Sequence, residues 1–331
     1  MSDYKVKQIK PNHADHISYY NSKFLDTMID EEYVIAQPKY DGERMLIHIN
    51  NGEVYCTSRR HSKKTDRYME NQDKLPILQS LVNDSEYLKN LGYTVIDCEA
   101  YSNDWSTIVG ILHSLPERAI ELQDETPAKF AVFDCLWFDG RELTEETYVD
   151  RLSYAIDVIE AFKYDNLHLV QFINPDGKIC DLYLAKPITS RTQIDFMMNS
   201  AIEAGFEGIV VKSFDKKYYD KGASLKCKKF ETVDVVVCDY VQGRGKYSDT
   251  IGALQVGYYD PDKDEVIRIS NVNCSTDAER NAWRDNWEDW KNTVIEVLCQ
   301  EVTERSLRHP RYVRRREDKD YKMCTKETIF K

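Results

Sequence analysis

The sequence has no long apolar run and little glycine or proline. No stretch approaches the ~18 consecutive apolar residues that a membrane-spanning helix needs. The N-terminal segment MSDYKVKQIK has none of the apolar core found in secretory signals. The 13 Gly and 9 Pro among 331 residues are too few for a linker-rich or collagen-like chain. These absences argue against a membrane or secreted protein.

Paired cysteines are also missing. The nine Cys are odd in number, are scattered along the chain, and never occur as C-x-x-C. That pattern argues against a zinc ribbon. Free thiols fit a reducing compartment, so we expect a cytoplasmic protein without a disulfide framework.

Charge of one sign dominates, because 57 acidic against 45 basic side chains leave a formal net charge of −12. That balance argues against non-specific adhesion to nucleic acid. Three local basic clusters depart from this acidic balance, at 59–67, 212–229 and 305–319. Each is either a solvated face or a phosphate-binding surface. Local binding stays possible because salt screens charges beyond about 8–10 Å.

The apolar pattern, with 42% hydrophobic residues, fits one large or two ordinary domains. We expect helices at 12–29, 75–91, 150–162 and 189–204, and strands at 33–37, 45–49, 54–57, 93–100, 129–138 and 208–212. Asn51-Gly52 predicts a hairpin, and Gly205 a helix C-terminus.

The composition changes near residue 231. We expect strands at 234–241, 253–259, 266–269 and 312–315, with one helix at 276–298. Several short strands and one helix in about a hundred residues favour a small β-barrel. Trp283, Trp287 and Trp290 share one face of that helix, which favours packing into a core over base stacking.

The most informative local pattern is Lys39-Tyr40-Asp41-Gly42-Glu43-Arg44, which lies on a turn between two strand-like runs. It is either a solvated polar hairpin or a reactive lysine. A deprotonated lysine amine can attack phosphorus. The Asp-Gly turn lets a nucleotide approach the backbone, and an arginine can bind a phosphate or ribose with two hydrogen bonds.

Further charged residues follow in order. Glu99 ends an apolar strand and Glu207 begins another, so the two carboxylates can hold Mg²⁺ on a polyphosphate. Lys226 and Lys228 alternate and therefore share one face of an extended segment. The sequence Arg316-Glu317-Asp318-Lys319 lies near the end of the chain.

In this order the elements resemble the signature of the covalent lysyl-nucleotidyltransferase superfamily. The chain resembles a small two-domain ATP-dependent DNA ligase of the bacteriophage type from about residue 33 to residue 319. The resemblance implies an α+β fold. An antiparallel-sheet nucleotidyltransferase (adenylylation) domain at 1–231 would be followed by a small OB-fold β-barrel domain at 232–331, with a hinge near residue 231.

The resemblance also implies roles for individual residues. Lys39 would be the catalytic lysine that is adenylylated, Arg59 would bind the 5′-phosphate of DNA, and Glu99 and Glu207 would hold the metal. ATP would be bound by Gln37, Lys39, Arg44, Glu99, Phe133, Glu207, Lys226, Lys228, Arg316 and Lys319. Two positions depart from the family pattern, since Cys98 replaces the usual glycine and Ser224 the usual tryptophan.

The implied reaction is the sealing of 5′-phosphate/3′-hydroxyl nicks through lysyl-AMP and DNA-adenylate, with ATP and Mg²⁺. We expect nicked duplex DNA as partner, no membrane, and a monomer. The alternatives are an mRNA-capping guanylyltransferase, an RNA ligase, and a non-catalytic nucleic-acid-binding OB protein. The segment after Lys319 is expected to be a loose tail.

Overall fold

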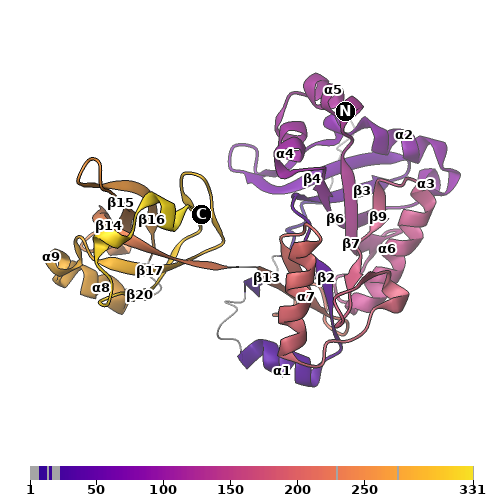
Figure 1. Ribbon diagram of the computed structural model, residues 1–331. Coiled ribbons are helices and arrows are strands. Elements are labelled where there is room, and N and C mark those ends of the chain that lie inside the picture. The colour runs from indigo at the N-terminus through magenta and orange to yellow at the C-terminus, as the bar shows by residue number, and fades with distance from the viewer. Residues whose placement is uncertain (1–6, 13–14, 17–22, 229, 274–275, 331) are drawn as a thin grey trace. The chain divides into compact units, whose positions relative to one another are not determined.

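The computed structural model describes the chain except residues 1–6, 13–14, 17–22, 229, 274–275 and 331. The chain divides into two compact units, residues 1–228 and 229–331 (Figure 1). The division lies beside residue 231, where the sequence predicts a boundary. None of the helices in the described part of the chain has the length and apolar character that a membrane crossing requires.

Two sheets, mainly antiparallel, form the N-terminal unit. The first has the order β1-β13-β12-β2-β10-β11. Its strands are Asp15–His16, Ser224–Lys228, Gly208–Ser213, Val34–Pro38, Phe172–Ile173 and Ile179–Cys180. The second has the order β5-β4-β3-β6-β7-β8, and β9 (Leu167–Leu169) pairs with β7. Its strands are Arg67–Glu70, Glu53–Ser62, Glu43–Asn50, Thr94–Tyr101, Lys129–Phe138 and Arg141–Glu142.

Helices cover these sheets and bury their apolar faces. Helix α7 (Arg191–Glu203) packs Ile194, Met197 and Ala201 against the first sheet. Helix α6 (Tyr148–Phe162) contributes Ala155 and Val158 to the core of the second sheet. The other helices are α1 (Lys23–Glu31), α2 (Pro76–Asp84), α3 (Glu86–Asn90), α4 (Trp105–His113) and α5 (Pro116–Glu125), with short 3₁₀ turns at Gln72–Lys74 and Leu182–Leu184.

Most N-terminal expectations agree with the structure, and the Asn51-Gly52 hairpin is confirmed. Both turn residues have positive φ, 48° and 86°, as a hairpin turn of this kind requires. The helix expected at 12–29 is wrong in part. Residues 15–16 form a strand, the helix begins at Lys23, and 13–14 and 17–22 lie outside the described residues. Helices α4 and α5 were not anticipated.

The C-terminal unit is a five-stranded barrel with the order β16-β15-β14-β17-β20. Its strands are Glu265–Val272, Ile251–Asp260, Glu231–Gln242, Val294–Cys299 and Arg311–Arg315. A parallel bridge between Asn273 and Arg311 links the two ends of this order. Along the chain, helix α8 (Asp277–Asp285) comes after the third strand of the barrel, β16, and before the fourth, β17. This is the OB-fold arrangement. The predicted α+β class is confirmed.

Two expectations for this unit are wrong. The helix expected at 276–298 ends at Asp285, and a short helix α9 (Trp287–Trp290) follows. The last part of the segment forms strand β17, which pairs with β14 in the barrel. The segment after Lys319 is not loose. It forms a 3₁₀ turn (Tyr321–Met323) and helix α10 (Lys326–Ile329), and its Cys324 and Ile329 are buried. The short pair β18 (Glu301–Val302) and β19 (Leu307–Arg308), together with a turn at Gly245–Tyr247, completes the unit.

The tryptophan stripe packs as the sequence predicts. Trp283 is fully buried in the barrel core, and Trp287 and Trp290 lie against it.

The variant Trp283→Ala should have a free energy of unfolding lower by about 3–5 kcal/mol, because the cavity that it leaves adds to the lost burial of apolar surface. Urea unfolding followed by circular dichroism measures this. The control is Trp105→Ala, whose side chain is 48% exposed. Equal losses for the two variants would contradict this account of the core.

Candidate functional site

Lys39 follows the end of β2, where the chain still pairs with the neighbouring strand. Its backbone N–H donates to the Gly208 carbonyl over 2.9 Å, and the Glu207 N–H donates to the Lys39 carbonyl over 3.0 Å. These two bonds extend the β2–β12 ladder by one residue on each strand. Backbone pairing therefore holds Lys39 beside Glu207 and Gly208.

Glu207 joins two lysines. Its Oε2 forms an ion pair with Lys39 Nζ, and its Oε1 lies 3.2 Å from Lys228 Nζ. Strands β12 and β13 pair with Gly208 opposite Lys228 and Val210 opposite Lys226. Along β13 burial alternates, so Leu225 and Cys227 enter the core while the two lysines face the other way. The predicted shared face of Lys226 and Lys228 is confirmed.

Arg44 and Glu99 are contributed by the second sheet, where they stand opposite each other on β3 and β6. The Arg44 guanidinium donates two hydrogen bonds to Asp97, at 2.8 and 2.5 Å, and one to the Tyr218 hydroxyl at 2.9 Å. It is thus already engaged by a carboxylate. A Cβ on Gly42 would lie 2.2 Å from the Ala100 carbonyl oxygen, so glycine is needed for this close approach of β6.

Phe133 occupies a bulge in β7. Asp97 pairs with Asp134 and Cys98 with Val132, which leaves Phe133 as the extra residue. Its carbonyl accepts hydrogen bonds from the Tyr148 hydroxyl (2.9 Å) and Lys212 Nζ (3.2 Å). The bulge re-aims this ring relative to its buried neighbours.

Gln37 and Lys212 complete this corner of the site from the first sheet. The buried Gln37 amide donates to the Tyr148 hydroxyl over 2.8 Å. Lys212 Nζ lies 4.7 Å from the Phe133 ring centre and 4.2 Å from that of Tyr148. Gln37, Tyr148, Phe133 and Lys212 therefore form one connected group.

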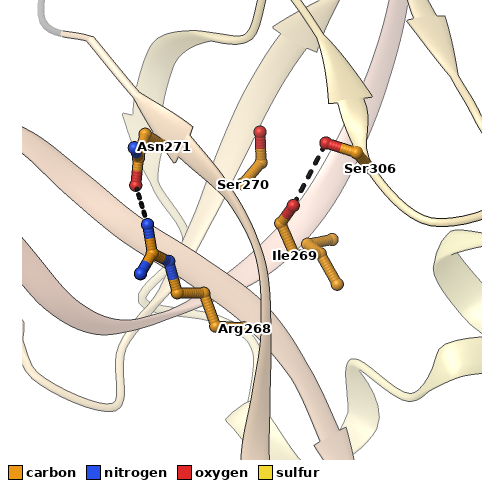
Figure 2. Close-up of a pocket in the computed structure, with 5 residues that line it drawn as sticks. All are labelled: Arg268, Ile269, Ser270, Asn271 and Ser306. Atoms are coloured by element: carbon orange, nitrogen blue, oxygen red, sulfur yellow. Dashed lines mark hydrogen bonds between the residues drawn. The ribbon is translucent and has the colours of Figure 1, made fainter.

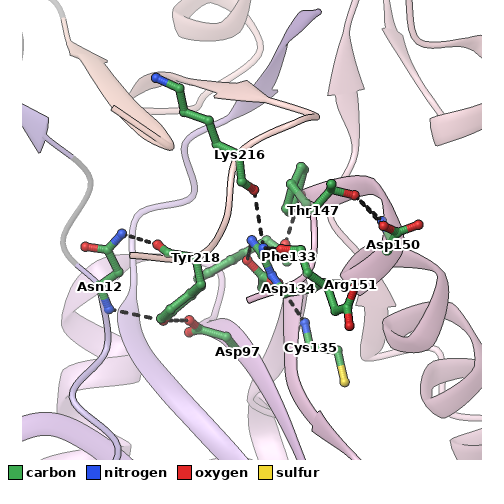
Figure 3. A network of polar contacts seen from close by, with 12 residues as sticks. Asn12, Asp97, Phe133, Asp134, Cys135, Thr147, Asp150, Arg151, Lys216 and Tyr218 are labelled. Carbon is green, nitrogen blue, oxygen red and sulfur yellow. Dashed lines mark hydrogen bonds and ion pairs between the residues drawn. The ribbon is translucent and has the colours of Figure 1, made fainter. Parts of the chain in front are cut away.

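Buried ionic contacts lie next to Phe133 in the chain and around it in the fold, and Figure 3 shows part of them. Arg151 of α6 donates two hydrogen bonds to Asp134, at 2.7 and 3.0 Å, and one to the Glu146 carbonyl at 2.7 Å. Asp97 accepts from the Tyr218 hydroxyl over 2.6 Å as well as from Arg44. Each buried carboxylate is thereby matched by one guanidinium, which offsets the cost of removing both from water.

Burial and neighbouring charges shift several pKa values. The pKa of Glu99 is raised to about 7, mainly by burial and also by the negative charge of Glu207, while Lys39 and Arg44 act to lower it. Burial acts to raise the pKa of Glu207, but Lys39 and Lys228 outweigh it and the pKa is lowered. For Lys226, burial and the positive charges of Lys39, Arg44 and Arg59 lower the pKa to about 8.

The remaining expected residues lie elsewhere. Arg59 is exposed on β4, close enough to act on the charge of Lys226. Arg316 and Lys319 belong to the C-terminal unit, where Asp234 accepts from Arg316 over 2.8 Å and from Lys319 over 3.1 Å. The other eight expected residues are all in the N-terminal unit, and we call this group the lysine site. Its members are Gln37, Lys39, Arg44, Glu99, Phe133, Glu207, Lys226 and Lys228.

A separate pocket of about 560 Å³ lies in the C-terminal unit, lined by Arg268, Ile269, Ser270, Asn271 and Ser306 (Figure 2). Its polar groups largely bond one another. Arg268 donates to Asn271 over 3.0 Å, and the Ser306 hydroxyl donates to the Ile269 carbonyl over 3.1 Å. No reactive residue expected from the sequence lines it.

The site residues expected from the sequence do not include Tyr148, Arg151, Lys212 and Tyr218. A signal existed for Arg151, since it follows Tyr148 by three residues and precedes Ala155 by four, on the buried face of α6. A charged residue at a core position of a helix indicates a buried partner. Lys212 ends the run Glu207 to Lys212, which is part of the family resemblance, but its contacts depend on the bulge at Phe133.

Comparison with protein families gives one clear match. Residues 14–229 match the family described as ATP dependent DNA ligase domain. Among curated proteins, DNA ligase 2 of Korarchaeum cryptofilum is 29% identical over 276 residues, 78% of this chain and 42% of that protein. A DNA ligase of Sulfolobus acidocaldarius is 28% identical over 258 residues, 74% of this chain and 40% of that protein. The chain thus spans about two fifths of the length of these relatives.

Solved structures share the fold. A structure named "Pmar-Lig_PreS3" superposes with a TM-score of 0.65 at 18% identity, covering 88% of this chain and 65% of that one. A structure from an analysis of DNA binding by Lig E DNA ligases has a TM-score of 0.61 at 15% identity, covering 93% of this chain and 99% of that one. At such identity the likeness establishes the fold alone.

Lys212 yields a prediction on pH. Burial lowers its pKa from 10.5 to about 8, with Asp134 opposing the shift. Below pH 8 the folded chain therefore pays the full cost of a buried charge, about 3 kcal/mol at ~1.4 kcal/mol per pKa unit. Between pH 8 and 10.5 the unfolded chain binds more protons, so rising pH relieves this cost.

The variant Lys212→Met lacks this titration. We expect wild type to gain about 2 kcal/mol relative to the variant between pH 7.5 and 10, measured by urea unfolding. Taking the difference cancels the titration of Lys226 and of the tyrosines. A difference that stays constant with pH would show that Lys212 does not titrate in this range.

Proposed function

Because the chain belongs to the family of ATP-dependent DNA ligase domains, we propose that it is an ATP-dependent DNA ligase that seals 5′-phosphate/3′-hydroxyl nicks in duplex DNA. One observation carries the proposal. Lys39 is held by backbone pairing within a cluster of two further lysines and two glutamates, an arrangement suited to phosphoryl transfer onto the Lys39 amine.

In the first step the deprotonated Lys39 amine attacks the α-phosphorus of ATP. A phosphorus–nitrogen bond forms, the bond to the β-phosphate oxygen breaks, and pyrophosphate leaves. Lys226 and Lys228 would neutralise the α-phosphate, where charge develops in the transition state. Phe133 would stack on adenine, and Gln37 would contact its edge. Arg44 would bind a phosphate or the ribose in exchange for the hydrogen bonds that it donates here to the Asn12 carbonyl and the Tyr218 hydroxyl.

Magnesium fits the same place. The charge of Glu207 acts on the ionisation of Glu99, so the two carboxylates share one region, and carboxylate oxygens suit this ion. Within the described residues no group of three His, Cys, Asp or Glu side chains is arranged to hold a metal. Phosphate oxygens and water would therefore complete its shell. Bound there, the ion would offset charge on the triphosphate.

In the second step AMP moves from Lys39 to the 5′-phosphate at a nick, which Arg59 would bind. In the third, the 3′-hydroxyl attacks that phosphate and AMP leaves. We further propose a cytoplasmic monomer. The free thiols of all eight described cysteines support a reducing compartment. The family match does not favour a capping guanylyltransferase, an RNA ligase or a non-catalytic binding protein.

The first test is intact-protein mass after incubation with Mg²⁺ and ATP, or Mg²⁺ and GTP, without DNA. We expect one AMP adduct from ATP, none from GTP, and none in Lys39→Ala, because only the Lys39 amine is placed to form it. Lys186→Ala is the matched control, since this lysine is exposed on a different segment. It should be adenylylated like wild type.

Sealing of a nicked duplex completes this test. Wild type should join the strands and Lys39→Ala should not. A GMP adduct from GTP alone would favour the capping reaction instead. If wild type formed no adduct and carried no pre-bound AMP, the ligase proposal would be wrong.

Asp234 is the basis for a second test, because it anchors both Arg316 and Lys319. If these two orient the leaving pyrophosphate, Asp234→Asn should slow lysyl-AMP formation about tenfold by loosening them. Sealing of a nick that is already adenylylated should keep its rate, since that step releases no pyrophosphate. Rapid-quench kinetics separates the two.

The control is Asp318→Asn, which removes only the exposed partner of Arg316. It should have a clearly smaller effect. If both steps slowed equally in Asp234→Asn, Asp234 would act through the stability of its unit and not through the two cations.

A further inference from the structure

The three basic clusters of the sequence have different fates in the fold. Most of the second is occupied, since Lys212 is buried, Lys216 pairs with Glu32 and Lys217 with Glu145. Most of the third is occupied too. There Arg308 pairs with Glu301, Arg314 with Glu296, and Arg316 and Lys319 with Asp234. Acidic side chains of the chain itself neutralise these cations except Lys212, which donates to the Phe133 carbonyl.

The first cluster is different. It forms the basic hairpin, residues 59–67, at the end of β4 and the start of β5 (Figure 1). Arg59, Arg60, Lys63 and Lys64 are exposed, and none of them forms an ion pair with a described residue. Arg67 is paired with Glu70 at 2.8 Å, and His61 lies 3.6 Å from Asp66. Four cationic side chains therefore remain in solvent on one hairpin.

The backbone holds these residues in a defined shape. Three residues of β4, 58–60, face one residue of β5, because Thr57 pairs with Glu70 and His61 with Tyr68. Such a bulge bends and twists the strand and aims side chains away from the regular sheet. The turn is closed by the Asp66 N–H, which donates to the Ser62 carbonyl over 2.9 Å. The bulge and this hydrogen bond therefore give the hairpin a defined backbone shape at the edge of the sheet.

A solubility role does not explain this cluster. The chain already carries a net charge of −12, so added cations reduce the charge that keeps it dispersed. The position of the hairpin near the lysine site favours instead a role in binding a polyanion there. Its base includes Arg59, whose charge acts on Lys226, and its turn lies about 10 Å further along the strand. That length corresponds to roughly three base pairs of duplex.

We propose that the basic hairpin binds the phosphate backbone of duplex DNA beside the nick, with Arg60, Lys63 and Lys64 as its contacts. This rests on the proposed function for the identity of its partner. Contacts to phosphates carry no sequence information, so they suit an enzyme that must act at any sequence. The hairpin extends the DNA surface of the N-terminal unit beyond the lysine site.

The test is the salt dependence of DNA affinity for the full chain. The variant Arg60→Gln/Lys63→Gln/Lys64→Gln should bind a nicked duplex more weakly, with a shallower slope of log affinity against log salt. Each lost phosphate contact should remove about 0.9 from the slope. For three contacts, the loss of affinity between 50 and 200 mM salt should become roughly 40-fold smaller. Fluorescence anisotropy at a series of salt concentrations measures both quantities.

Two controls isolate the hairpin charge. The variant Lys163→Gln/Lys178→Gln/Lys186→Gln makes the same change of net charge on exposed lysines elsewhere in the N-terminal unit and should keep the wild-type slope. The variant Arg60→Lys/Lys63→Arg/Lys64→Arg retains every charge and should also keep it. The slope should change equally on a continuous duplex, because the contacts are to backbone and not to the nick.

Adenylylation of Lys39 without DNA should be unchanged in the hairpin variant, which also shows that the variant is folded. An unchanged salt slope, or an equal change in the Lys163/Lys178/Lys186 variant, would overturn the inference. Failure of the proposed function has a different signature, the absence of a lysyl-AMP adduct in wild type. DNA binding by the hairpin is measured independently of that adduct.

Discussion

The structure depends on two buried carboxylates that stand side by side. Asp97 on β6 pairs directly with Asp134 on β7, and both are almost inaccessible to solvent. Like charges at such positions repel, and each needs a cation from another element. Arg44 of β3 supplies one and Arg151 of α6 the other. The ion pair between Arg151 and Asp134 therefore links the position of α6 to β7 beside its bulge at Phe133, and the pair between Arg44 and Asp97 links β3 to β6.

Local sequence signals predicted the parts of the fold that local forces decide. Asn51-Gly52 is a hairpin because few other pairs adopt two successive positive φ angles. Residues 276–298 show the limit. The tryptophan spacing continues past Asp285, but the run at 294–299 is rich in β-branched residues and completes the barrel as β17, so strand pairing overrides the helical pattern. The tail after Lys319 likewise owes its order to buried Cys324 and Ile329.

The candidate site shows the same division. The order of motifs identified residues that the fold brings together, because Lys39 and Glu207 are joined by a backbone hydrogen bond at the ends of β2 and β12, and Lys228 pairs with Gly208 beside them. It assigned no role at the site to Lys212 or Tyr148. Their contacts with Phe133 arise from one extra residue in β7, and a register shift between distant strands leaves no mark in either strand's own sequence.

Charge explains why the lysine site is suited to a polyphosphate. The chain as a whole is acidic, yet Lys39, Arg44 and Arg59 together depress the pKa of Lys226, which burial also lowers. A cluster of cations held this closely is unfavourable in the free protein, and an anion placed among them relieves the repulsion. The repulsion is therefore greatest where phosphate would bind. In the C-terminal unit, Asp234 removes the corresponding repulsion between Arg316 and Lys319, so these two cations are kept together by the chain itself. Asp234 thus does for Arg316 and Lys319 what Glu207 does for Lys39 and Lys228, and the repulsion that a ligand anion would relieve is the one on Lys226.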